Sequence, residues 1–124
     1  MPTRQQTFAT KTYTRVAAIE ARSQEYKDRY GSLAHRLPVL IRSAGLAQAL
    51  AYIEARGKDE GKQLLVDLAS VLDVASSTEF IKQARESQLT EYMHLTQQSL
   101  DALLWFKRFA QTILKVAANT ENKD

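Results

Sequence analysis

Hydrophobic residues recur at three- and four-residue spacings through nearly the whole chain, and this periodicity constrains the fold more than any other feature. Such spacings build one face of an α-helix, whereas a half-buried β-strand requires apolar and polar residues to alternate. No stretch of the sequence sustains that alternation. Four glycines and two prolines are also too few for the many tight turns of an all-β protein. The sequence therefore predicts an all-α fold.

The 124-residue chain has the size of one typical domain and is long enough to bury a core without disulfide or metal support. The absence of cysteine excludes disulfides, thiolate zinc sites and a cysteine nucleophile, and it is typical of a reducing cytoplasm. No apolar run approaches the roughly 20 residues of a membrane span, and the first residues lack the apolar part of a signal peptide. We therefore expect one helical domain over residues 1–118, a frayed polar tail over residues 119–124, and a cytoplasmic location without membrane contact.

Glycines divide the periodic pattern into a single compact bundle of about six helices. Gly31, Gly45 and Gly57 each follow a periodic segment, as glycines at helix C-termini do. The first and last helices are expected to be long, with the last at the centre of the bundle. The expected ranges are 3–29, 32–43, 46–56, 59–74, 76–86 and 89–118.

Other residues indicate helix starts and breaks. Ser32 is placed to cap the second helix, and Pro38, which lacks an amide donor, predicts a break or kink near Leu37. Ser76 and Glu79 have the spacing of a capping box, in which two side chains reciprocally satisfy free backbone donors. A short fifth helix is therefore expected to start there.

Charge is distributed unevenly along the chain. Residues 1–58 carry ten basic and four acidic side chains, a net charge of +6, whereas residues 59–124 carry seven basic and ten acidic side chains, a net charge of −3. Two interpretations are open. The chain has either a basic face for an anionic partner or complementary ends that attract copies of the same protein.

Five cations of the expected first helix fall on one edge. Their spacings of 7, 4, 7 and 7 residues place them within roughly 20° of one line that extends about 37 Å. A line of that length suits the phosphates of a polyanion backbone better than one small ligand. The competing interpretation is a solvated helix face, which is often rich in basic residues. The five candidate residues are Arg4, Lys11, Arg15, Arg22 and Arg29.

Catalytic and metal-binding patterns are sparse. Glu91 and His94 form one Glu-x-x-His unit, which di-iron carboxylate bundles use twice, but His35 has no Glu three residues before it. A metal-dependent bundle enzyme is therefore a remote alternative to a surface or capping role for this pair. Two histidines and no Gly-x-Ser-x-Gly motif give a hydrolase triad little support. We expect neither catalysis nor a cofactor.

The last helix carries Trp105, Phe106 and Phe109 beside Lys107 and Arg108. Aromatic side chains clustered on an apolar helix mostly form core, and that interpretation is favoured here. The neighbouring cations leave open a partly exposed basic and aromatic edge that stacks bases.

Two segments and a basic opening carry a family resemblance. Residues 37–52 read LPVLIRSAGLAQALAY, in which Leu-Pro and Gly-Leu-x-Gln-Ala-Leu are the more specific parts. Tyr92, Thr96 and Leu100, followed by WFKRFA at 105–110, form the second segment, and residues 4–16 form the opening. In this order they resemble the small, all-helical subunit of the type III-B CRISPR effector, the Cmr complex. The resemblance covers nearly the whole chain.

This resemblance implies a non-catalytic subunit that stacks in several copies beside the subunits holding the guide RNA. It would help to accommodate target RNA in antiviral defence, while nuclease activity belongs to other subunits. Its partners would be the other effector subunits, copies of itself, and guide and target RNA, with a stack built by a contact between the basic first half and the acidic second half. The RNA-binding residues would be the five first-helix cations with Lys107 and Arg108. The rival interpretation is a helical adaptor that binds only protein.

Overall fold

The computed structural model describes residues 1–118, which contain six α-helices and no strand. The predicted all-α bundle is confirmed, and the predicted frayed tail, residues 119–124, lies outside the described residues. Within residues 1–118, no helix combines the length and apolarity that crossing a membrane requires. The helices are α1 (Arg4–Ile19), α2 (Gln24–Ala44), α3 (Leu46–Arg56), α4 (Lys58–Val71), α5 (Ser77–Glu86) and α6 (Leu89–Thr112).

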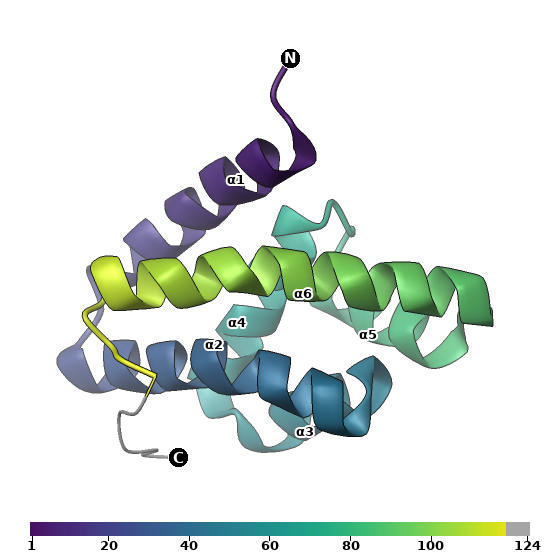
Figure 1. Ribbon diagram of the computed structural model, residues 1–124. Coiled ribbons are helices and arrows are strands. Elements are labelled where there is room, and N and C mark those ends of the chain that lie inside the picture. The colour runs from purple at the N-terminus through teal and green to yellow at the C-terminus, as the bar shows by residue number, and fades with distance from the viewer. Residues whose placement is uncertain (119–124) are drawn as a thin grey trace.

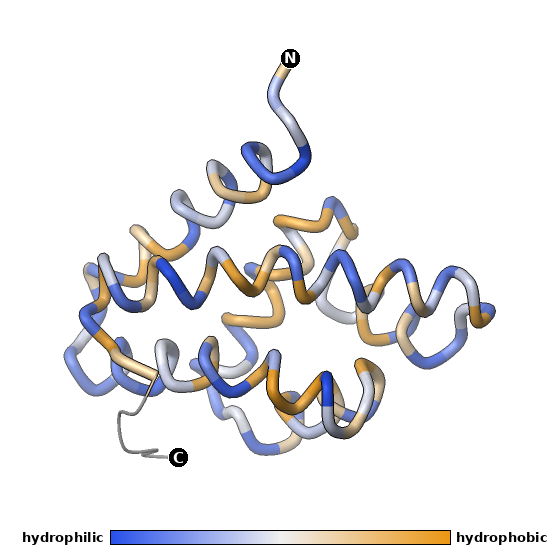
Figure 2. Tube along the Cα trace, viewed as in Figure 1, coloured by the Kyte–Doolittle hydropathy of each residue, from blue (hydrophilic) through white to orange (hydrophobic). Residues whose placement is uncertain are grey.

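The longest helix, α6, crosses the front of the molecule in Figure 1, with α1 on one side and α2 on the other. It also packs against α4 and α5, which agrees with the predicted central place of the last helix. Hydrophobic and hydrophilic residues interchange along each helix in Figure 2, because each helix turns one apolar face inward. These faces form one core, whose largest fully buried side chains include Tyr30, Phe80 and Phe106.

The first helix is shorter than predicted. α1 ends at Ile19, and after a loop over 20–23 the Ser23 hydroxyl accepts a hydrogen bond from the Tyr26 amide at 3.2 Å and caps α2. The prediction of one helix over 3–29 is therefore wrong. A serine cap starts a second helix in the middle of that range.

The second helix, α2, continues through two residues predicted to interrupt it, Gly31 and Pro38. A Cβ at Gly31 would lie 2.6 Å from Val116 Cβ. Glycine is therefore required here by the close approach of the C-terminal segment and not by a turn. Pro38 removes a helical hydrogen bond at a cost of about 3 kcal/mol, which core packing on both sides of it offsets. Ser32 is consequently a buried mid-helix residue and not a cap. The buried residues around Pro38 include Leu33, Leu37 and Ile41.

Gly45 ends α2 and starts α3, whose bounds are those predicted. Its φ of 90° lies in the left-handed region that favours glycine. No side chain at its own N-terminus caps α3, but the Tyr92 hydroxyl of α6 accepts a hydrogen bond from the Ala47 amide at 3.1 Å. The two segments that carry the family resemblance therefore meet at this joint.

The later helices follow the predicted order with some shifted ends. The Ser76 hydroxyl accepts a hydrogen bond from the Glu79 amide at 3.0 Å and caps α5, as predicted. The reciprocal bond of the predicted capping box, from the Ser76 amide to the Glu79 side chain, does not form in the described residues. By contrast, α4 and α6 end at Val71 and Thr112, before the predicted 74 and 118.

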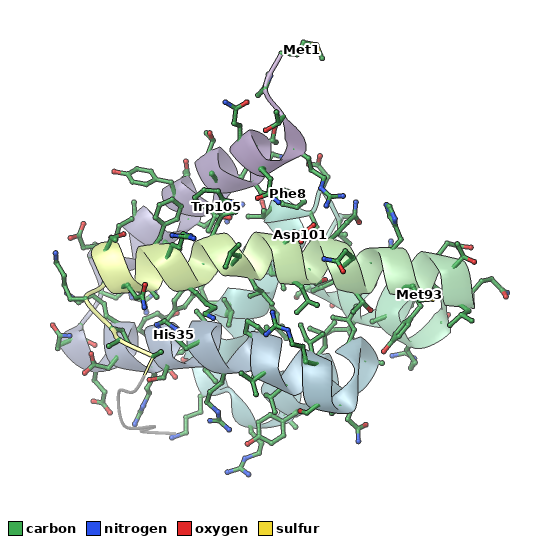
Figure 3. The ribbon with its side chains drawn as sticks, viewed as in Figure 1. Met1, Phe8, His35, Met93, Asp101 and Trp105 are labelled. Atoms are coloured by element: carbon green, nitrogen blue, oxygen red, sulfur yellow. The ribbon has the colours of Figure 1, made fainter. Side chains whose placement is uncertain are left out.

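The segment after α6 leaves the helix and packs on α2 (Figure 1). Leu114 and Val116 are buried there. His35 Nε2 lies 2.9 Å from the Val116 carbonyl oxygen, and Figure 3 shows His35 beside this segment. Continuing α6 to residue 118 would remove these contacts from the core, which explains its earlier end.

Candidate nucleic-acid interface

Three of the predicted cations, Arg4, Lys11 and Arg15, share one edge of α1, as their spacing predicts. Each lies beside a carboxylate from later in the chain. Arg4 pairs with Asp101 of α6, which Figure 3 shows on the side of α6 nearer α1. Lys11 Nζ lies 2.9 Å from Asp73 Oδ1, in the turn after α4. We call these three cations with their acids Asp101, Asp73 and Asp67 the ion-pair seam.

The third cation of the seam, Arg15, meets a buried acid. Its guanidinium lies 3.4 Å from Asp67 Oδ1 and donates a hydrogen bond of 2.7 Å to the Ser70 hydroxyl. The Tyr30 hydroxyl donates to Asp67 Oδ2 at 2.6 Å, and the Gln63 side-chain amide donates to Oδ1 at 2.8 Å. Because Asp67 is only 1% exposed, these neighbours replace most of the water that would otherwise solvate it.

Desolvation dominates the electrostatics of this cluster. It raises the pKa of Asp67, although the hydrogen bonds to the carboxylate and the charge of Arg15 act in the opposite direction. Desolvation and the nearby Asp67 carboxylate raise the pKa of Tyr30 well above its usual value, so this phenol stays protonated as a donor. Asp67 was not among the residues predicted from the sequence. Its spacing from Leu64 and Val71, three and four residues away, was the available signal that it lies on the apolar face of α4.

The other two cations of the predicted line lie outside α1. Arg22 lies in the loop between α1 and α2, with its guanidinium carbon 3.9 Å from the centroid of the Tyr26 ring. Arg29 lies on α2, pairs with Glu25 at 2.7 Å and reaches Glu60 at 4.0 Å. The prediction of five cations on one straight edge is therefore wrong, because the helix that would align them ends before Arg22.

The opposite charges of the two halves pair inside the molecule. α1 and α6, from opposite ends of the sequence, pack side by side. The halves are therefore not separate ends of the fold, and pairing neutralises part of the +6 charge internally. The described residues include four ion pairs that join the halves, namely Arg4–Asp101, Lys11–Asp73, Arg15–Asp67 and Arg29–Glu60.

A second surface of α1 and α6 is aromatic. Phe106 is fully buried in the core, as favoured from the sequence, whereas Trp105 and Phe109 are half-buried. The Phe109 ring centroid lies 5.5 Å from that of Tyr13 and 5.9 Å from that of Trp105. We call Tyr13, Trp105 and Phe109 the aromatic edge.

Of the last two predicted cations, Arg108 adjoins the aromatic edge, whereas Lys107 lies roughly 160° around α6 from Trp105 and from Phe109. The exposed Arg108 places its guanidinium carbon 5.9 Å from the Trp105 ring centroid, and Lys107 is half-buried. Among residues 1–118, no acid forms an ion pair with either cation. These two cations are therefore less neutralised by the fold than those of the ion-pair seam.

The Glu-x-x-His unit lines an open cavity of about 670 Å³ between α5 and α6. Both Glu91 and His94 are exposed there, beside Glu79 and Glu86. In the described part of the chain, no group of three or more potential ligand residues is arranged to hold a metal ion. The unit has the character of a solvated surface pair.

Known proteins resemble this chain over most of its length. The CRISPR-associated protein family Cas_Cmr5 matches residues 4–113. The CRISPR system Cmr subunit Cmr5 of Thermus thermophilus is 45% identical over 115 residues, which are 93% of this chain and 99% of that protein. A crystal structure of a CRISPR-associated Cmr5 family protein from the same organism has a TM-score of 0.82 and 44% identity, covering 91% of this chain and 98% of that one. The protein belongs to the Cmr5 family of CRISPR-associated proteins.

Proposed function

We propose that this protein is a non-catalytic small subunit of a type III-B CRISPR RNA-guided effector complex that acts in antiviral defence in the cytoplasm. It stacks there in several copies and contacts the backbone of target RNA or of the guide–target duplex. The observation that carries the proposal is the 45% identity to the Thermus Cmr subunit over 93% of the chain. The family match runs from α1 to α6, so the whole fold supports the proposal and not one motif alone.

Exposed apolar side chains support a place within an assembly. Leu89, Met93 and Leu104 of α6 are 72%, 62% and 45% exposed. At about 100° per residue they fall within roughly 60° of one another around the helix. Apolar side chains gathered on one exposed face indicate contact with another protein. We assign this face to neighbouring subunits or copies of the chain, with the remaining opposite charges steering their approach.

The cations differ in their availability to RNA. Arg22, Lys107 and Arg108 form no ion pair with an acid among residues 1–118, so no carboxylate of these residues competes with a phosphate for them. Arg4 and Lys11 form ion pairs at the surface, which contribute only about 0–1 kcal/mol, and a phosphate displaces the carboxylate at little cost.

Arg15 and Arg29 are the least available of the proposed RNA-binding residues. Both approach buried acids, Asp67 and Glu60, that would lose their cation if RNA took it. Their contribution to RNA contact is therefore secondary to their contact with the fold.

The proposed mechanism is electrostatic and geometric. Base pairing between guide and target supplies sequence specificity, and this subunit contacts phosphates and maintains subunit spacing. Such a role requires no reacting side chain and no cofactor.

Purification of the tagged, full-length protein from its native host tests the proposal. We expect the large effector subunits and the guide RNA to copurify, as identified by mass spectrometry and RNA sequencing. Native mass spectrometry of the intact complex should show more than one copy of this chain. Recovery of neither effector subunits nor guide RNA would refute the effector role, and a single copy would refute stacking.

Crosslinking within the same complex distinguishes the rival function. If the chain crosslinks to other subunits and never to RNA, a protein-only adaptor replaces the proposed RNA contact.

A further inference from the structure

The aromatic edge places an aromatic side chain largely in solvent. Tyr13 is 54% exposed, while the buried face of α1 runs through Phe8, Thr12 and Val16. Its ring meets the Phe109 ring edge-on, with an interplanar angle of 86°. Phe109 is in turn stacked with Trp105 at an interplanar angle of 29°. Three rings from two helices therefore form one continuous surface.

A hydrogen bond between the helices fixes the indole of Trp105. Its Nε1 donates to Gln5 Oε1 at 2.8 Å, and Figure 3 shows Trp105 between α6 and α1. The indole N–H is the only hydrogen-bond donor of this side chain, so stacking and apolar contact are what the ring still offers a ligand. Because the rings are already held by two helices, little side-chain entropy is lost on binding.

A cation adjoins these rings. Arg108 lies against Trp105, and it has no acidic partner in the described part of the chain. An ordinary protein partner needs only the apolar surface, whereas this cation favours a polyanion. Rings that stack on bases, next to cations that contact phosphates, are the combination that binds single-stranded nucleic acid.

We propose that the aromatic edge stacks on an unpaired base of single-stranded RNA, with Arg108 contacting a flanking phosphate. This inference rests on the proposed function and assigns its ligand more narrowly. A duplex is excluded as the ligand of this site, because its bases already stack on their neighbours. Recognition is sequence-tolerant, because every base has a π face.

Trp105 is the only tryptophan of the chain, so its fluorescence reports directly on this surface. The full-length protein is titrated at low salt with a short oligoadenosine single strand and with an RNA duplex of equal phosphate content. We expect the single strand to quench Trp105 emission and the duplex to leave it unchanged. Equal quenching by both, or quenching by neither, overturns the proposal.

Substitutions at Tyr13 test the π face. Tyr13→Leu keeps an apolar contact with Phe109 and should weaken single-strand binding roughly fivefold to a hundredfold, as loss of one stacked base does. Tyr13→Phe should restore affinity. Val39→Ala, at a comparably exposed apolar residue of α2, is the matched control and should bind like the parent. Unchanged affinity of Tyr13→Leu, in protein that circular dichroism shows to be helical, overturns the proposal.

Photocrosslinking in the purified effector complex separates this inference from the proposed function. A complex that contains guide and target RNA, but crosslinks only outside the peptides carrying Tyr13 and Trp105, overturns base stacking and leaves the effector role intact. Quenching by single strands, in a protein that copurifies with no effector subunit, supports the stacking site and refutes the effector role.

Discussion

Two neighbouring surfaces of α1 and α6 use their side chains in opposite ways. In the ion-pair seam, the cations that dominate the sequence pattern face carboxylates of the same chain. In the aromatic edge, the Trp105 and Phe109 rings expected in the core are partly exposed beside Arg108, which has no acidic partner among residues 1–118. The number of charges in a segment therefore does not give the charge that a ligand meets, because pairing inside the fold neutralises part of it.

Breaking the seam at its buried end should have the largest effect. Asp67→Ala removes the acceptor of the buried Tyr30 hydroxyl and the acidic partner of Arg15. We expect the free energy of unfolding to fall by about 2–4 kcal/mol, because a buried donor loses its acceptor. Urea denaturation followed by circular dichroism measures this change. The matched Arg108→Ala should leave stability unchanged, and equal losses in both variants would erase the distinction between the two surfaces.

The second prediction concerns salt dependence. Replacing Lys107 and Arg108 together by Ala should lower the slope of log affinity for target RNA against log salt by roughly 1.4–1.8, the value for two lost phosphate contacts. The measurement uses the assembled complex. The loss of affinity should be equal for all target RNAs that pair with the guide. Arg15 with Arg22 replaced by Ala should lower the slope less, because Asp67 already holds Arg15.

A Glu20→Ala variant is the control for that series and should leave the slope unchanged. If the Arg15 and Arg22 substitutions lower the slope more than the Lys107 and Arg108 substitutions do, the cations of the ion-pair seam contact RNA more than those of the last helix.

A smaller effect follows from the pKa of Asp67. Since burial raises this pKa above its unfolded value, the folded state binds the proton more tightly than the unfolded chain does. The resulting stabilisation is present at low pH and is lost as the pH rises through the folded pKa. The parent protein should therefore lose stability over this range relative to Asp67→Asn, which does not titrate there. Urea midpoints at several pH values measure the difference, and the opposite slope would show that Arg15 outweighs desolvation.

The smallest effect is expected at the solvent end of the seam. Lys11→Ala removes an ion pair whose acid, Asp73, has a side chain that is 84% exposed. Exposed pairs contribute less than about 1 kcal/mol, and Ala is a good helix former. The urea midpoint should therefore hardly move. A loss as large as that of Asp67→Ala would show that the whole seam acts as one cooperative unit.

Sequence patterns located the helices wherever a single residue determines the local backbone. Gly45 has the positive φ that favours glycine, and the Ser76 hydroxyl caps the helix that follows it. The same rules failed where a distant contact determines the outcome. Gly31 reads locally as a helix stop, but it is present because Val116 packs against its Cα.

In the candidate site, too, features set by local spacing were predictable and features set by distant contacts were not. The spacing of Arg4, Lys11 and Arg15 correctly places them on one edge of α1, because helical periodicity is local. Their acids come from α4, the turn after it and α6, and no spacing within α1 indicates them. The sequence could not decide whether the aromatic side chains of the last helix are buried or exposed, because their exposure depends on how α1 packs against α6.

The hydrogen bond between Tyr92 and Ala47 has a consequence for the order in which the nascent chain folds. The cap of α3 lies 45 residues downstream, so at roughly 5–20 residues per second α3 waits several seconds of synthesis for it. An interrupted chain that ends before α6 would lack both the cap of α3 and the acid that pairs with Arg4. It would carry the same net charge of +3 as the whole chain, because residues 89–124 hold four basic and four acidic side chains. Translation of the final helix thus completes the core and these two contacts without changing the net charge of the protein.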